Sequence, residues 1–127
     1  MGRAGGADEV DCYVGARISL RRSALGLSQS ALAQRIGVSF QQVQKYETGQ
    51  NRISASRLHR VAAVLGTSVE SFFPPDEDPS STRAGVQVLR SLTATADGRA
   101  VAAGFPMIAD RDLRQAVARI VTALARA

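Results

Sequence analysis

The sequence predicts an all-α protein, and three features of its 127 residues support this fold class. Alanine is abundant and runs of β-branched residues are absent, which favours helices over strands. Aromatic residues make up only 5% of the chain and there is no Trp, so Leu, Val, Ile and Ala must fill the core, as in packed helices. Ser residues that can cap helices alternate with Gly residues that can end them.

The first helix is expected to begin near Tyr13, after a Gly-rich and charged segment. That segment, residues 1–12, is predicted to be a disordered tail. Val14, Ile18 and Leu25 fall on one face of the helix, and the glycine that follows Leu25 ends it.

A second helix is expected between a Ser28 cap and Gly37, with Leu32, Ala33 and Ile36 buried. Ala33 lies where a steeply crossing neighbour would approach, so a larger side chain would push the helices apart. Gly37 adopts a positive φ at little cost, which lets the chain reverse at once.

A third helix is expected between a Ser39 cap and Gly49, with Val43 and Tyr46 facing inward and Val38 as an apolar residue in the turn. Two capped helices of this length, with Ala, Gly and Val at this spacing, are typical of a helix-turn-helix. A fourth helix follows its Ser54 cap and carries an i, i+3, i+4, i+7 stripe, and a short fifth helix brings three more apolar residues to the core. These residues are Leu58, Val61, Ala62 and Leu65, then Val69, Phe72 and Phe73.

Residues 74–84 are predicted to be a linker, because prolines stop the preceding helix and acidic and hydroxyl residues keep the segment solvated. Residues 85–127 are expected to be a helical extension. Within it, residues 85–93 fit a helix or a strand, and Thr95 can cap a helix that runs to Gly104.

Asp110 is expected to cap a last helix with a narrow apolar seam, which is the predicted homodimer interface: Leu113, Val117, Ile120 and Leu124. The alternative is that this seam packs on Phe105 and Val101 within the extension. Both can hold together, because an appendage of about 40 residues has too little volume for a core of its own.

Charge is concentrated in residues 13–73, which carry eight basic and two acidic side chains and therefore a net charge of +6. The whole chain carries +5, so the remainder sums to −1. A basic lobe on a near-neutral chain suggests a polyanion partner, and the alternative is a charge that serves solubility alone. With the helix-turn-helix pattern, the expected polyanion is double-stranded DNA.

The outer face of the third helix carries the residues predicted to read bases: Phe40, Gln41, Gln44 and Lys45. Glutamine can pair bidentately with the adenine edge, and lysine can donate to guanine. Phe40 can pack on a thymine methyl group or, alternatively, fold back as a hydrophobic staple. Predicted phosphate ligands lie at helix starts, late in the first helix and in the loop after the third: Arg22, Ser28, Gln29, Ser39, Asn51, Arg52 and Ser54.

The stretch from Val14 to Phe73, which includes SQSALAQRIGVSFQQVQKYETG, resembles the Cro/C1-type (XRE-family, lambda repressor-like) helix-turn-helix domain of bacterial and phage regulators. The resemblance covers about half of the chain and implies one five-helix domain. It implies that Gln29 grips phosphate, that the four residues named above face bases, and that Glu47 pairs with Arg22 or Arg35. Phe40 departs from the small or polar residue often found there, so no base preference is transferred. The region around the third and fourth helices looks especially like regulators of alphaproteobacteria.

Other functions find little support in the sequence. The one histidine, His59, has no catalytic partner nearby, and no Cys/His cluster has the spacing of a metal site, so we expect neither an enzyme, a metal nor a cofactor. A single cysteine, Cys12, fits a reducing cytoplasm, and no apolar run is long enough to span a membrane.

These features predict a homodimeric, sequence-specific DNA-binding transcriptional regulator, more as a repressor than as an activator, in the cytoplasm and associated with the nucleoid. The alternative is an antitoxin-like or anti-regulator module whose C-terminal region binds another polypeptide and which binds DNA to regulate its own gene.

Overall fold

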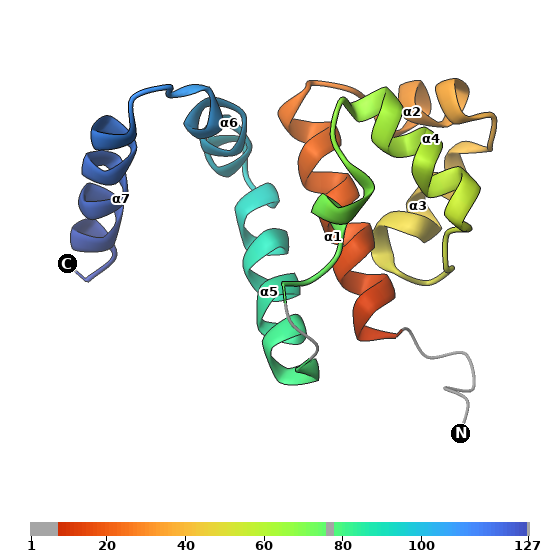
Figure 1. Cartoon of the computed structure of the whole chain (residues 1–127), viewed down its shortest axis with the longest axis horizontal. Helices are drawn as coiled ribbons and strands as arrows, with labels where there is room; N and C mark the ends of the chain where they lie inside the picture. The colour runs from red at the N-terminus through yellow and green to blue at the C-terminus, as the bar shows by residue number, and fades with distance from the viewer. Residues whose placement is uncertain (1–7, 76–77, 127) are drawn as a thin grey trace.

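The computed structural model describes residues 8–75 and 78–126, and the regular structure in these ranges is entirely helical (Figure 1). The predicted all-α fold class is therefore confirmed. The elements follow in this order: α1 Glu9–Ala24, α2 Gln29–Ile36, α3 Phe40–Thr48, α4 Ala55–Leu65, the 3-10 helix η1 Val69–Phe72, α5 Pro79–Thr93, α6 Ala96–Gly104, the 3-10 helix η2 Phe105–Met107, and α7 Arg111–Ala125.

The first helix begins earlier than the sequence predicted. The Asp8 carboxylate accepts a hydrogen bond from the Val10 N–H at 2.8 Å and caps α1, so the helix starts at Glu9 rather than near Tyr13. Residues 8–12 are thus ordered, contrary to the predicted tail, whereas residues 1–7 lie outside the described range. Leu25, expected on the buried face, follows the helix end and is 47% exposed.

One apolar core joins α1, α2, α3, α4 and η1. It consists of Val14, Ile18, Leu32, Ala33, Ile36, Val43, Leu58, Val61, Ala62, Leu65 and Phe72, with Val38 and Val69 packed against it. The stripes predicted for the second and fourth helices lie in this core, as does Val43 of the third, and Tyr46 is also buried, at 6% exposed. Phe73 was placed wrongly, because the chain becomes extended after η1 and leaves this ring 44% exposed.

The extension contains more helix than the sequence predicted. Asp78 caps α5, which starts at Pro79, so residues 79–84 belong to a helix and not to the predicted linker. The open choice for residues 85–93 is settled as helix. The predicted caps Thr95 and Asp110 are confirmed, because their side chains accept backbone hydrogen bonds at the starts of α6 and α7.

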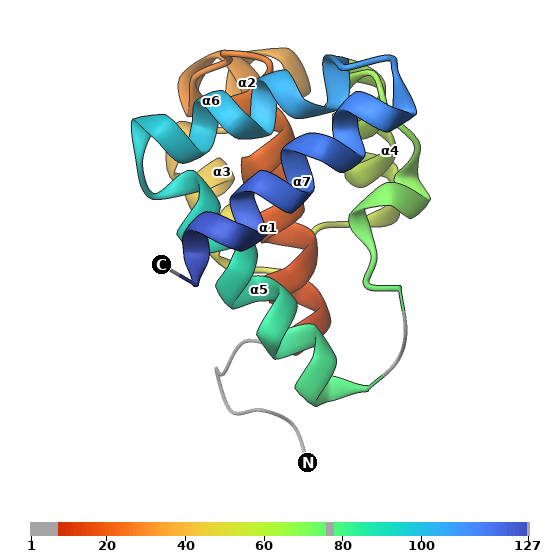
Figure 2. The ribbon, with the colours of Figure 1, turned by 90° about the vertical axis from the view of Figure 1, so that its left-hand side faces the viewer.

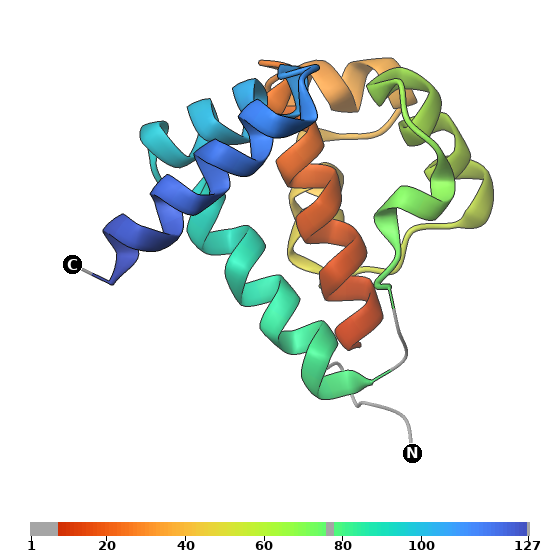
Figure 3. The same ribbon diagram turned by 60° about the vertical axis from the view of Figure 1, so that its left-hand side comes forward.

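The extension joins the rest of the molecule mainly through α5, which runs alongside α1 (Figure 3). Thr82 and Val86 of α5 are buried there. Gly85 approaches Tyr13 so closely that an added Cβ would lie 2.9 Å from the ring atom Cε2. Seen from the left-hand side of Figure 1, α7 is the outermost layer, in front of α5 and α6 (Figure 2).

Candidate nucleic-acid interface

The α2–α3 pair consists of two capped helices with a left-handed glycine between them. The Ser28 Oγ accepts from the Ala31 N–H at 3.0 Å, and the Ser39 Oγ accepts from the Gln42 N–H at 3.1 Å. Gly37 has a φ of 76°, which a residue with a side chain adopts only at a cost. The predicted caps and turn are therefore confirmed.

Close packing between the two helices decides which face of α3 points outward. Ala33 and Val43 are 4% and 1% exposed, as predicted for residues at the crossing. The Ala33 carbonyl accepts from the N–H groups of Gly37 at 2.9 Å and Val38 at 3.0 Å. Because this face is buried, the opposite face of α3 carries only side chains that do not pack in the core.

That outer face is polar and slightly hollowed. Gln41, Gln44 and Lys45 are exposed, and they share an open hollow of about 430 Å³ with Gln29, Thr48 and Gln50. The structure thus places three of the four predicted base-reading residues together with the predicted phosphate anchor Gln29. Phe40 lies at the first turn of α3 and is 41% exposed, so part of its ring is accessible to a partner.

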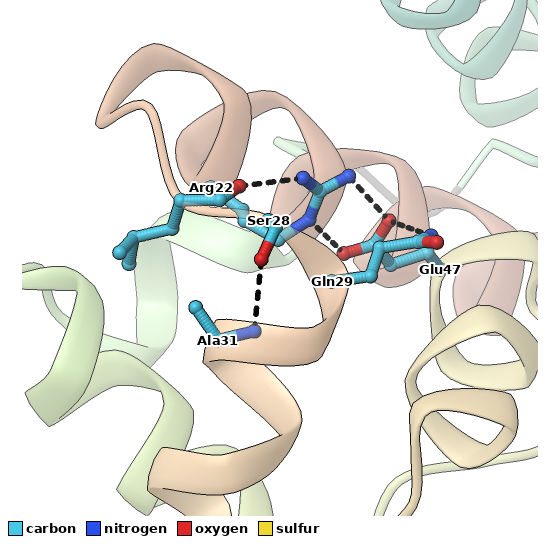
Figure 4. A network of polar contacts seen from close by, with 6 residues as sticks. Arg22, Ser28, Gln29, Ala31 and Glu47 are labelled. Atoms are coloured by element: carbon cyan, nitrogen blue, oxygen red, sulfur yellow. Dashed lines mark hydrogen bonds and ion pairs between the residues drawn. The ribbon is translucent and has the colours of Figure 1, made fainter.

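A buried carboxylate holds the start of α2 against the end of α3 (Figure 4). Arg22 donates from Nε and Nη2 to the two Glu47 oxygens at 2.6 and 2.9 Å, and Gln29 donates from Nε2 to Glu47 Oε1 at 2.9 Å. The Arg22 Nη1 donates to the Leu27 carbonyl at 2.8 Å. Such bidentate, charge-assisted bonds are strong and fix side-chain geometry.

This network decides which arginine pairs with Glu47 and bears on the predicted role of Arg22. The partner of Glu47 is Arg22, whereas Arg35 is exposed on α2. The Arg22 side chain is only 13% exposed and its guanidinium donates to Glu47 and Leu27, which does not favour a phosphate contact; that role stays a prediction. Gln29, in contrast, is oriented by Glu47 at the rim of the hollow, and its amide has a second N–H to donate.

The loop between α3 and α4 carries the remaining predicted phosphate ligands. Asn51 and Arg52 are exposed, and the Asn51 N–H donates to the Lys45 carbonyl at 3.2 Å. Ser54 is exposed and caps α4. The Arg52 side chain is 66% exposed and its Nε lies 3.2 Å from Oδ2 of Asp11 in α1, whose side chain is 13% exposed. Most of the Arg52 side chain therefore stays accessible to a second anion.

The predicted seam of α7 is uncovered. Within Arg111–Ala125 no residue is buried, and Leu113, Ile120 and Leu124 are 58%, 58% and 69% exposed. Val117 is half-buried. Val101, offered as an internal partner for the seam, is itself 51% exposed. Packing within the extension therefore covers only a small part of this apolar face.

Two contacts of the site were missed by sequence reasoning. Gly15 of α1 lies against α3, where an added Cβ would come within 2.2 Å of the Tyr46 carbonyl oxygen. An isolated glycine inside a helical pattern was the available indication of this close approach. The other is a hydrogen bond from Arg90 of α5 to the Thr48 carbonyl at 3.3 Å, which no sequence pattern indicates.

The described residues offer little for other chemistry. Among them, no group of three or more His, Cys, Asp or Glu side chains can hold a metal ion. No described helix is long and apolar enough to cross a lipid bilayer. His59 is exposed on α4.

Comparison with known proteins bears on the same region. A family model described as helix-turn-helix matches residues 18–72. A transcriptional regulator in the ATPase CF(0) region of Rhodospirillum rubrum is 59% identical over 64 residues, which are 50% of this chain and 59% of that relative. No solved structure gives a significant match.

Two further relatives match almost the whole chain. HTH-type transcriptional regulators of Sinorhizobium medicae and Rhizobium meliloti are each 37% identical over an alignment of 123 positions that covers 91% of this chain and 88% of theirs. A match of this extent includes most of the C-terminal extension, so α5, α6 and α7 have counterparts in these relatives.

Proposed function

Because the chain belongs to the Cro/C1-type helix-turn-helix family of DNA-binding transcriptional regulators, which are not enzymes, we propose that it is a repressor that binds its operator as a homodimer. It acts in the cytoplasm, on the nucleoid. Repression needs only occupancy of a promoter, because a bound dimer excludes the polymerase. The observation that carries the proposal is the hollow of polar side chains on the outer face of α3.

In the proposed complex α3 lies in the major groove. Gln41 and Gln44 pair with adenine edges, and Lys45 donates to guanine N7 or O6. These side chains are exposed, so they can meet base edges without any rearrangement of the core. Phe40, at the first turn of α3, packs on a thymine methyl group.

Phosphate ligands on both sides of α3 set its register on the duplex. Gln29 and the capping residues Ser28 and Ser39 lie at helix starts, where unpaired N–H groups and the helix dipole favour an anion. Asn51, Arg52 and Ser54 hold the backbone on the other side. Arg52, whose side chain is 66% exposed beside its partner Asp11, donates to a phosphate.

The dimer is held by α7. Leu113, Val117, Ile120 and Leu124 follow a spacing that two helices can pair, and three of the four are more than half exposed in the single chain. Dimers also suit paired half-sites, because two-fold symmetric proteins bind two-fold symmetric operators.

The direct test is selection of bound genomic fragments, followed by gel shifts at several salt concentrations. We expect salt-sensitive, sequence-selective binding. Gln41→Ala should relax preference at one base position by about 1–3 kcal/mol, whereas Arg52→Ala should weaken all sequences together. Gln34→Ala is the matched control, because Gln34 is exposed on α2 but does not line the hollow. If Gln41→Ala changes neither affinity nor preference, α3 does not read bases.

Sedimentation equilibrium tests the dimer. Leu124→Asp should shift the full chain to monomer, because it places a charge in the seam. Leu25→Asp makes the same change at an exposed position beside α1 and should leave the assembly unchanged. A wild-type chain that stays monomeric at all concentrations would exclude the dimer.

The exposed seam also supports the second candidate, an antitoxin-like or anti-regulator module. In that case the seam binds another polypeptide, and DNA binding serves to regulate the protein's own gene. A stoichiometric partner that co-purifies with the full chain and is lost on Leu124→Asp would favour this function over the homodimer.

A further inference from the structure

One basic side chain of the extension lies at the edge of the DNA-facing surface. The close contact of Gly85 with Tyr13 fixes α5 against α1, and Thr82 and Val86 are buried in the same contact. Farther along α5, Arg90 reaches the end of α3, where its Nη2 donates to the Thr48 carbonyl at 3.3 Å. The extension therefore touches the helix that is proposed to read bases.

This position is suited to a cation. Thr48 is the last residue of α3, and the final carbonyls of a helix lack partners within it and carry a partial negative charge. The Arg90 side chain spans from this carbonyl to Cys12 of α1, and it is exposed. A guanidinium has five N–H donors, so its bonds to Thr48 and Cys12 leave donors for an anion.

A small hollow connects Arg90 with the proposed phosphate anchor. It has a volume of about 220 Å³ and is lined by Ala16, Ser19, Gln29, Glu47, Thr48, Arg90 and Thr93. Gln29 and Thr48 also line the larger hollow on the outer face of α3. The two hollows therefore adjoin, and Arg90 faces the same edge of the molecule as Gln29.

The charges around this hollow leave it attractive to anions. Its one carboxylate, Glu47, already accepts hydrogen bonds from Nε and Nη2 of Arg22 and from Nε2 of Gln29. The guanidinium of Arg90 is the cation that remains on its rim. A fork of N–H donors beside an amide is the arrangement that binds a phosphate bidentately.

We propose that Arg90 is a DNA phosphate ligand, so that the C-terminal extension adds to the footprint of the helix-turn-helix. This inference rests on the proposed function, because the phosphate is the one next to that bound by Gln29. The simpler role for Arg90 is structural: it fastens α5 to the end of α3 and never meets DNA.

The salt dependence of binding separates these roles. Each phosphate contact contributes about 0.9 to the slope of log affinity against log salt concentration. We expect Arg90→Gln to reduce the slope of the full chain on its selected DNA site by about this amount. The ratio of wild-type to variant affinity should then fall about threefold when the salt concentration rises fourfold. Arg90→Lys keeps the charge and should keep the slope.

Arg83→Gln is the matched control. Arg83 lies on the same helix as Arg90, and its substitution removes the same charge. Arg83 pairs with Glu9, however, and does not line the hollow with Gln29. It should leave the slope unchanged, and thermal melts should show that both variants are folded. An unchanged slope for Arg90→Gln, or an equal loss in both variants, would overturn the proposal. Failure of the wild-type chain to bind DNA at all would instead refute the proposed function.

Discussion

The helix-turn-helix half and the C-terminal extension both contain amphipathic helices, but the apolar face is buried in the first and exposed on α7 in the second. Leu65, on the stripe of α4, is 1% exposed, whereas Leu124, on the seam of α7, is 69% exposed. Both were predicted from the same three- and four-residue spacing. The spacing therefore tells which face of a helix needs cover, but not whether its own chain supplies that cover.

The helix ends account for part of this difference. In the first half, α2, α3 and α4 end at Gly37, Gly49 and Gly66, all with positive φ, so the chain turns sharply and successive helices fold back on one core. In the extension, α5 and α6 end at residues in the right-handed helical region. α7 then lies on the outside, with its seam open to a second chain.

The largest loss of stability is expected at the close contact between α1 and α3. Gly15→Ala places a Cβ within 2.2 Å of the Tyr46 carbonyl oxygen, so α1 must move away from α3. We expect a loss of about 4–5 kcal/mol in the free energy of unfolding, measured by urea denaturation. Gly104→Ala is the control in the extension: no atom lies within 4 Å of its added Cβ, and its effect should stay within about 0.5 kcal/mol. Equal losses would show that α6 is packed as tightly as α1.

Removing a buried ion pair should lower the free energy of unfolding more than removing an exposed ion pair between the two regions. Glu47→Ala leaves the Arg22 guanidinium without its buried partner and should cost about 3–5 kcal/mol. Glu9→Ala breaks the exposed pair with Arg83 between α1 and α5 and should cost less than about 1 kcal/mol. Urea denaturation of the two variants checks this order, and a Glu47→Ala variant as stable as Glu9→Ala would contradict it.

Substitution of Leu65 and of Leu124 tests whether the apolar faces of α4 and α7 differ in burial within the single chain. Leu65→Ala removes buried surface and should cost about 2–5 kcal/mol at any protein concentration. Leu124→Ala should change the stability of the single chain by no more than about 0.5 kcal/mol, because the side chain has few neighbours to lose. At concentrations where the chain dimerises, Leu124→Ala should lower the melting temperature and wild type should melt higher as concentration rises. A concentration-independent loss for Leu124→Ala would mean that α7 packs within its own chain.

The smallest effect is expected on the reactivity of the Cys12 thiol, which lies where α1 meets α5. Burial raises the pKa of the Cys12 thiol, and the nearby Arg90 only partly opposes this. Because the thiolate is the reactive form, iodoacetamide at pH 8 should modify Cys12 more slowly in the folded protein than in urea. Arg90→Gln should slow the reaction further, since it removes the charge that favours the thiolate. Equal rates in folded and unfolded protein would contradict the raised pKa.

Much of the interface was predictable from the sequence. The caps Ser28 and Ser39, the turn at Gly37 and the buried pair Ala33 and Val43 follow from rules that act within a few residues. Once these positions are buried, helical geometry alone places Gln41, Gln44 and Lys45 outside. The roles of those side chains toward DNA remain predictions.

Only the tertiary structure decided which distant residues meet. Glu47 pairs with Arg22 and not with Arg35, Gly15 lies against α3, and Arg90 donates to Thr48. In each case the packing of the helices brings together residues 25 or more positions apart. The sequence alone determined the caps and the apolar stripes of α2, α3 and α4, because those depend on neighbours along the chain. It did not determine the starts of α1 and α5. The partners of the charged side chains depend on crossing angles, which only the packed core sets.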